Sequence, residues 1–214
     1  MSKISILKKL ALIAAGAMIL PAFAAAEIKM GIILGFTGPI ESLTPDMGSS
    51  AELAFKEASD SGQLLGGQKI SVVRADSTCI DAAAASAAAE RLITSDKVAG
   101  IMGADCSGVT TAIANNVAVP NGVTMISPSA TSPALSTIAD NGYFFRTAPS
   151  DARQGQVLAE ITMERGFNNV AVTFINNDYG KGLSDSYINA YKGLGGKVSA
   201  VVPHEADKAD FSAE

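Results

Sequence analysis

Short apolar runs alternate with helical patterns along most of the chain. Four of the runs are rich in β-branched residues and lack a strict alternation of apolar and polar positions, as expected of strands that are buried on both faces of a parallel sheet. They are residues 28–36, 69–75, 98–104 and 122–127. Because helical patterns separate these runs, the order predicts a doubly wound α/β domain with right-handed crossovers.

The helical patterns carry apolar stripes and start signals. Three of them lie between or after the strands, at residues 49–62, 81–97 and 107–119. In the second, one face is formed by Ala85, Ala88, Ala89 and Leu92, which are spaced as an amphipathic helix requires. Asp81 precedes that face and is the expected N-cap.

The alternation starts again after residues 143–151. The second series predicts helices at 151–166 and 180–196 and strands at 169–175 and 197–202. The first of these helices has an apolar stripe formed by Gln154, Val157, Leu158 and Ile161.

The restart predicts two lobes. We interpret residues 147–150 as the crossover, so that residues 27–148 form an N-terminal α/β lobe and residues 149–214 the start of a second one. Two strands and two helices cannot cover both faces of a parallel sheet. We therefore expect the second lobe to be incomplete in this chain: either further residues complete it, or the chain is a truncation, and we favour a fragment.

The N-terminus has the features of a secretory signal peptide. Lys3, Lys8 and Lys9 precede the apolar run at residues 10–20, and small residues follow up to Ala26. A permanent anchor is the weaker interpretation, because the run is short for a bilayer and Pro21 follows it directly. We expect residues 1–26 to be removed and the mature protein to be periplasmic, without a membrane anchor.

Removal of this leader makes the protein more acidic. Of the 16 Lys and Arg residues, three precede Glu27, which leaves 13 against 21 Asp and Glu and a net charge of −8. Such a charge argues against nucleic acid or an anionic membrane surface as a partner.

The two cysteines predict a disulfide. In an exported chain, Cys79 and Cys106 are expected to pair, and each follows one of two successive predicted strands. If those strands were adjacent in the sheet, the two loops would lie side by side, which suits the short reach of a disulfide. The alternative is two free buried thiols.

Five loops are expected where ligands bind in open α/β sheets, at the carboxyl ends of the strands. They are residues 35–42, 76–79, 104–108, 127–133 and 176–182. Helix starts are expected at Ser107, as a probable N-cap, at Ser132-Pro133 and near Gly180. Free N–H groups beside hydroxyls can bind a small anion such as a carboxylate. The alternative is that these hydroxyls only cap helices.

The chain offers little chemistry for catalysis. His204, the one histidine, lies beside Pro203, and nothing marks it as the base of a Ser-His-Asp triad. The sequence contains no G-x-S-x-G, G-x-G-x-x-G or Walker motif, and it has no C-x-x-C spacing for a metal. We therefore expect no catalytic residue, no metal and no cofactor, and a protein that is not an enzyme.

At these loops the chain resembles the periplasmic binding proteins of branched-chain amino acid ABC transporters, the Leu/Ile/Val-binding type. The resemblance runs from Glu27 to Glu214. It is carried by GIILGFTGP, by the cysteine pair with a serine directly after the second cysteine, and by ISPSATSPALS, FRTAPSDARQG and NNDYGKGL.

The resemblance implies two lobes joined by a hinge that close on a ligand. It also implies that Ser107 binds the α-carboxylate of an amino acid, that Ser129 and Ala130 offer backbone groups, and that Tyr179 covers the ligand from the second lobe. Thr131 would bond both the ammonium and the carboxylate, and an acidic partner for the ammonium would lie beyond Glu214.

On this basis the expected function is that of a receptor which captures a small amino acid and delivers it to a membrane ABC permease. The ligand is expected to be a branched-chain or aliphatic amino acid. The alternative is a periplasmic sensor for an amino acid or a small amide built on the same fold. A secreted hydrolase is disfavoured because no base is present.

Overall fold

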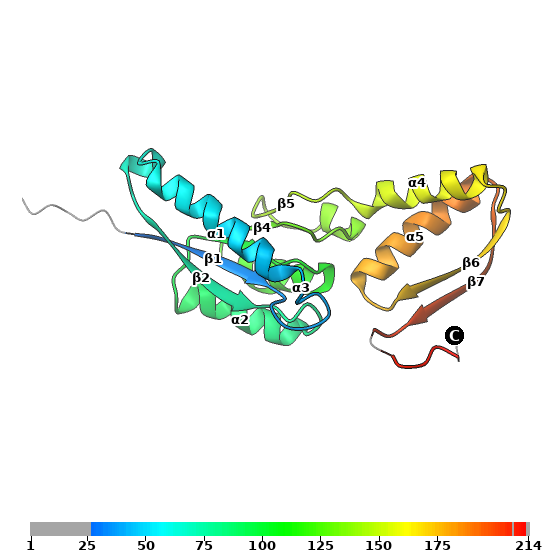
Figure 1. The fold of residues 1–214 in the computed structure, drawn as a ribbon, viewed down its shortest axis with the longest axis horizontal. Helices are drawn as coiled ribbons and strands as arrows, with labels where there is room; N and C mark the ends of the chain where they lie inside the picture. Colours follow the sequence, from blue (N-terminus) through cyan, green and yellow to red (C-terminus); the bar gives the residue numbers. More distant parts are fainter. Residues whose placement is uncertain (1–26, 207, 213–214) are drawn as a thin grey trace, which may run out of the picture.

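The computed structural model describes residues 27–206 and 208–212, without the side chain of Leu65. The predicted signal peptide, residues 1–26, lies outside the described residues. The secondary structure forms two groups, one containing the first five strands and the other containing the last two (Figure 1). Within the described residues, no helix is both long and apolar enough to span a membrane.

The first group is built on a five-stranded parallel sheet. Its strand order is β2-β1-β3-β4-β5, and every neighbouring pair is parallel. The strands are β1 (Ile28–Leu34), β2 (Ile70–Asp76), β3 (Gly100–Gly103), β4 (Thr124–Ser127) and β5 (Phe144–Arg146). The first four confirm the predicted strands. The pattern of the sequence did not predict β5.

Helices cover both faces of this sheet, as the doubly wound prediction requires. They are α1 (Thr44–Asp60) on one side, and α2 (Ala82–Thr94) and α3 (Ser107–Ile113) on the other (Figure 1). α3 continues as the π-helical turn η2 (Ala114–Ala118), and two 3₁₀ turns, η1 (Leu64–Gly66) and η3 (Pro133–Ser136), lie in the connections.

The predicted stripe of α2 lies in the core. Ala85, Ala89 and Leu92 are fully buried, and Ala88 is partly buried against the same cluster. Asp81 caps the helix as expected, since its carboxylate accepts the N–H groups of two residues of the first turn. The apolar stripe, the N-cap and the burial of α2 therefore all agree with the helix predicted from the sequence.

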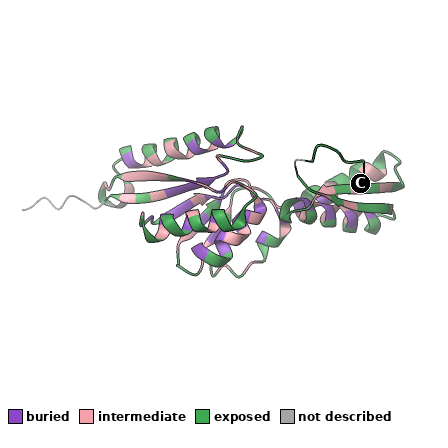
Figure 2. Cartoon of the chain, turned by 90° about the horizontal axis from the view of Figure 1, so that it is seen from below, coloured by how far each residue is buried: buried purple, intermediate pink, exposed green. Residues whose placement is uncertain are grey.

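The second group contains α4 (Asp151–Glu164), β6 (Asn169–Ile175), α5 (Asp178–Gly193) and β7 (Lys197–His204). The two strands are parallel and α5 packs on them, but no residue of either strand is buried (Figure 2). Within the described residues this sheet is covered by helices on one face (Figure 1).

The inward face of α4 differs from the predicted stripe. The buried residues are Asp151, Gly155 and Ala159, whereas Leu158 and Ile161 are 41% and 38% exposed. The reason is the close packing of α4 along α5, because a Cβ on Gly155 would lie 2.6 Å from the backbone nitrogen of Tyr187. The face of α4 that packs against α5 is therefore set by its small residues, and a search for an apolar stripe does not find these.

Candidate functional site

A cleft of about 980 Å³ lies between the two groups. All five predicted loops contribute to its lining: Ile40, Cys79, Asp105 to Gly108, Ser129 and Thr131 come from the first lobe, and Asn176 to Tyr179 from the second. The cleft therefore lies where parallel strands of both sheets end, which is the usual place for a ligand in this class of fold.

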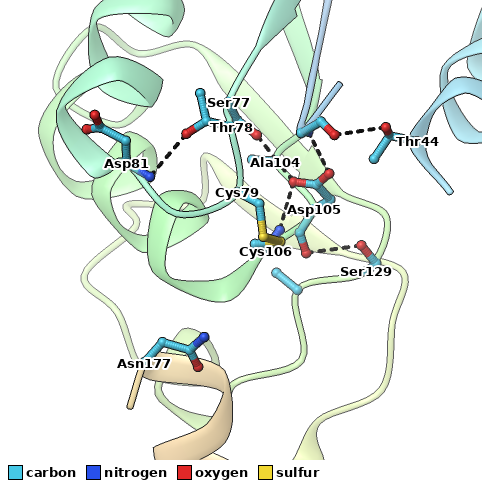
Figure 3. The surroundings of a disulfide bond; sticks show 12 residues. Thr44, Ser77, Thr78, Cys79, Asp81, Ala104, Asp105, Cys106, Ser129 and Asn177 are labelled. Atoms are coloured by element: carbon cyan, nitrogen blue, oxygen red, sulfur yellow. Dashed lines mark hydrogen bonds between the residues drawn. A yellow bond between two sulfur atoms is a disulfide. The ribbon is translucent and has the colours of Figure 1, made fainter. Parts of the chain in front are cut away.

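The disulfide lies on the wall of this cleft. Cys79 and Cys106 are bonded, with their Cα atoms 5.2 Å apart (Figure 3), so the predicted pairing is confirmed. Only the supporting condition, that the two strands are adjacent in the sheet, was wrong, because β1 lies between β2 and β3. The bridge crosses the end of β1 at Gly35, where a Cβ would lie 3.1 Å from the Cβ of Cys79.

Asp105 ties together the loops that follow the first three strands. Its carboxylate accepts the N–H of Gly35 at 2.7 Å, the N–H of Cys106 at 2.9 Å and the hydroxyl of Ser77 at 3.3 Å (Figure 3). The side chain is 3% exposed. A carboxylate of this kind was not singled out in the sequence, although it directly follows a buried strand.

A second carboxylate holds the loop after β1. Asp76 accepts the hydroxyl of Thr37 at 2.6 Å and the N–H of Thr78 at 2.8 Å. Burial raises the pKa of the Asp76 carboxyl, but these hydrogen bonds together outweigh it, so the pKa lies below its ordinary value. The loops on both sides of the disulfide are thus fastened by acidic side chains.

Ser107 lies at the first position of α3 and not at its N-cap, which is Cys106. The expected helix start is correct, but the cap assignment was off by one residue. The Ser107 side chain is 2% exposed, and its hydroxyl oxygen accepts the N–H of Ser132 at 3.1 Å. This bond joins the loop after β3 to the segment after β4.

Ser129 and Thr131 line the cleft, whereas Ala130 does not. The hydroxyl of Ser129 donates to the carbonyl of Asp105 at 3.0 Å. The N–H of Ala130 donates to the hydroxyl oxygen of Ser127 at 3.0 Å, and its carbonyl accepts from Arg146 at 3.1 Å. Both backbone groups of Ala130 are therefore engaged within the protein, and the role of Ala130 toward a ligand stays a prediction.

Thr131 is connected to the start of the second group. Its hydroxyl donates to Asp151 Oδ2 at 2.7 Å, and its carbonyl accepts the N–H of Asp151 at 2.9 Å. Asp151 is 2% exposed and lines the cleft. In the sequence, Asp151 is an acidic residue at the start of a predicted helix, a position that the helix dipole alone explains. Sequence reasoning therefore did not identify it as a residue of the cleft.

Arg146 supports the same segment from β5. Its guanidinium donates to the carbonyls of Ala130 and Ser132, at 3.1 and 2.8 Å, and to the hydroxyl of Ser136 at 2.6 Å. Burial lowers the pKa of Arg146, and the charge of Asp151 acts in the opposite direction. Residues 129–132 are thus held on both sides by hydrogen bonds within the protein.

The second lobe contributes the start of α5. Tyr179 lines the cleft and is 42% exposed. The helix begins at Asp178, two residues before the predicted start, because Asn177 is its N-cap and accepts the N–H of Gly180 at 2.8 Å. Ser107, Ser129, Thr131 and Tyr179 therefore share one cleft.

The lining of the cleft is rich in polar groups that can hold a molecule. His204 packs edge-on against Phe211 and is not among the residues that line the cleft. In the described part of the chain, no group of three or more His, Cys, Asp or Glu residues could hold a metal ion. Hydroxyls, amides and backbone groups can bind a polar ligand.

The sequence of the chain is similar to those of known binding proteins. A family profile described as periplasmic binding protein matches residues 27–214. The chain is 30% identical over 164 residues to the Leu/Ile/Val-binding protein BraC3 of Rhizobium johnstonii, covering 76% of this chain and 43% of that protein. It is 31% identical over 193 residues to a leucine-, isoleucine-, valine-, threonine- and alanine-binding protein of Pseudomonas aeruginosa, covering 89% and 50%.

One solved structure has a similar backbone fold. The branched-chain amino acid transporter substrate-binding protein LivJ of Streptococcus pneumoniae, in complex with isoleucine, superposes with a TM-score of 0.75 at 30% identity, covering 88% of this chain and 52% of that one. The chain spans about half the length of the curated relatives it matches.

Proposed function

The chain belongs to the periplasmic binding protein family, and we propose that it is an extracytoplasmic receptor that captures a small aliphatic amino acid between two lobes and delivers it to an ABC permease. The lobes in this proposal are residues 27–148 and 149–214, with residues 1–26 as a cleaved signal peptide. In this proposal the receptor releases its ligand unaltered.

The observation that carries the proposal is the convergence of three hydroxyls on one cleft. Ser107, Ser129 and Thr131 lie on loops that follow β3 and β4, and Tyr179 faces the same space from the second lobe. Hydroxyls and helix N-termini bind the carboxylate of an amino acid without a buried cation. The names of the two relatives, which state that those proteins bind leucine, isoleucine and valine, support the same ligand class here.

Calorimetric titration of the intact protein with L-leucine, L-isoleucine and L-valine tests the proposal. Hydrogen bonds to charged groups contribute about 1.5–3 kcal/mol each, so Thr131→Ala and Ser107→Ala should each weaken binding by about one to two orders of magnitude. Thr137→Ala is the matched control, because its exposed hydroxyl donates to Ala134 O and does not line the cleft.

The result that would contradict the proposal is equally specific. If the intact protein binds none of the three amino acids, it is not a receptor of this class. If it binds one of them and both cleft variants keep the affinity of the wild type, the ligand lies elsewhere on the protein.

A further inference from the structure

The cleft carries negative charge without a neighbouring cation in its lining. Asp105, Asp151, Asp178 and Glu205 line it, whereas the described residues contribute no lysine, arginine or histidine to its walls. A ligand that is only an anion meets an unfavourable potential in such a cleft. A ligand that also carries a positive group, such as an ammonium, offsets this potential.

Asp151 is the acidic residue most directly connected to a cleft hydroxyl. Its carboxylate accepts a hydrogen bond from the Thr131 hydroxyl at 2.7 Å, and its own N–H donates to the carbonyl of Thr131 at 2.9 Å. None of the ion pairs found among the described residues includes Asp151. The Arg146 guanidinium donates instead to two carbonyls and to the hydroxyl of Ser136, so the charge of Asp151 is not neutralised by direct contact.

The internal hydrogen bonds decide what each hydroxyl can do for a ligand, because a hydroxyl has one proton. Thr131 donates its hydroxyl hydrogen bond to Asp151. Ser129 donates its own to the carbonyl of Asp105 (Figure 3). Both hydroxyls can therefore only accept from a ligand. Ser107 is the opposite case, because its oxygen accepts the N–H of Ser132 and its proton remains free to donate.

These polarities orient an amino acid in the cleft. The carboxylate, which only accepts, fits the free proton of Ser107, and the ammonium, which only donates, fits the oxygens of Ser129 and Thr131. We propose that Asp151 is a positioning and specificity-determining residue: by accepting the hydrogen bond that the Thr131 hydroxyl donates, it leaves that hydroxyl only as an acceptor and requires an ammonium group on the ligand. This inference rests on the proposed function and names the part of the ligand that the cleft selects.

Asp151→Asn tests this selection with two probes that differ in one group. L-leucine and 4-methylpentanoate share the carbon skeleton and the carboxylate, but 4-methylpentanoate lacks the ammonium. In the intact protein, Asp151→Asn should weaken leucine binding by about ten- to a hundredfold, the range for a lost charge-assisted interaction, and leave 4-methylpentanoate within about twofold. Ligand-observed NMR competition measures both, including millimolar dissociation constants.

Two further variants make the test independent of how well Asp151→Asn folds. Thr131→Val keeps the branched shape but removes the hydroxyl, so it should show the same selective loss of leucine. The double variant should lose little more than either single one, because the two residues act through one bond. Ser107→Ala is the matched control and should weaken both probes alike, because it removes a contact to the carboxylate.

Equal weakening of the two probes by Asp151→Asn and by Thr131→Val would show a scaffold role and overturn the inference. Equal affinity of the wild type for both probes would also overturn it, while leaving the receptor function in place. Failure of the proposed function looks different, because the wild type would then bind none of the branched-chain amino acids.

Discussion

Substitution of Asp105 by alanine should destabilise the first lobe far more than a surface substitution of the same kind. Asp105→Ala removes the acceptor of two backbone N–H groups, those of Gly35 and Cys106, and of the Ser77 hydroxyl. The carboxylate is 3% exposed, so water does not readily replace it. The hydroxyl of Ser77 can rotate to another partner, but the two backbone groups cannot.

The magnitude follows from these two groups. A buried donor that loses its acceptor costs about 1–3 kcal/mol. The N–H of Gly35 is buried and that of Cys106 is partly buried, so their loss together should lower the free energy of unfolding by about 4 kcal/mol. For a protein of this size, each kcal/mol lowers the melting temperature by about 2–4 °C. Asp105→Ala should therefore lower it by roughly 8–16 °C.

Asp81→Ala is the control that isolates burial. Asp81 also accepts two backbone N–H groups, those of Ala83 and Ala84, both at 2.9 Å, but it is exposed at the start of α2. Loss of such a cap costs about 1 kcal/mol, because water satisfies the freed groups. Thermal and urea denaturation of the intact protein under oxidising conditions, followed by circular dichroism, compares the two variants. Equal losses would refute the reasoning that burial makes Asp105 the more costly residue.

The remaining predictions concern the helix pair of the second lobe and the disulfide. Gly155→Ala places a Cβ 2.6 Å from the nitrogen of Tyr187, so it should lower stability in thermal denaturation by about 1–3 kcal/mol. Gly193→Ala, whose Cβ would meet nothing within 4 Å, should be neutral or slightly stabilising, and an equal loss in both would contradict this. Thiol labelling in denaturant should find neither Cys79 nor Cys106 without a reductant and both with it, and reduction should cost about 3.5 kcal/mol by the chain-entropy relation; an unchanged melting temperature would count against that figure.

Much of the first lobe could be predicted from its sequence because each of its first four strands is a short apolar run bounded by helical patterns. β5 could not, because three residues are too few to show a period. Its pairing with β4, in which Phe144 lies beside Met125, depends on a neighbour that is close only in the folded chain. The same limit applies to α4, where packing against α5 selects Gly155 and Ala159 as the inward residues.

The disulfide shows how a correct prediction can rest on an incomplete reason. Two cysteines in an exported chain were enough to predict the pair, but the sequence order of the strands does not give their order in the sheet. β1 lies between β2 and β3, and the bridge passes over its end at Gly35, which has no Cβ to crowd the Cβ of Cys79.

The candidate site divides in the same way. The loops and most of their hydroxyls could be predicted, because strand ends and helix starts have local signals. The partners of those hydroxyls could not. Thr131 and Asp151 are 20 residues apart, and in the sequence Asp151 is indistinguishable from any acidic residue at the start of a helix.

This difference matters for specificity. The hydroxyls determine where a ligand can bind. Their hydrogen-bond partners within the protein determine whether each hydroxyl donates to the ligand or accepts from it, and so what kind of ligand group can bind there. Because Ser129 and Thr131 donate inward and Ser107 accepts inward, the first lobe is arranged for an acceptor at one end of the ligand and a donor at the other. A preformed arrangement of this kind also reduces the ordering that binding would otherwise cost. A relative could keep every hydroxyl and still select a different ligand if its residue at the position of Asp151 no longer accepted a hydrogen bond from Thr131.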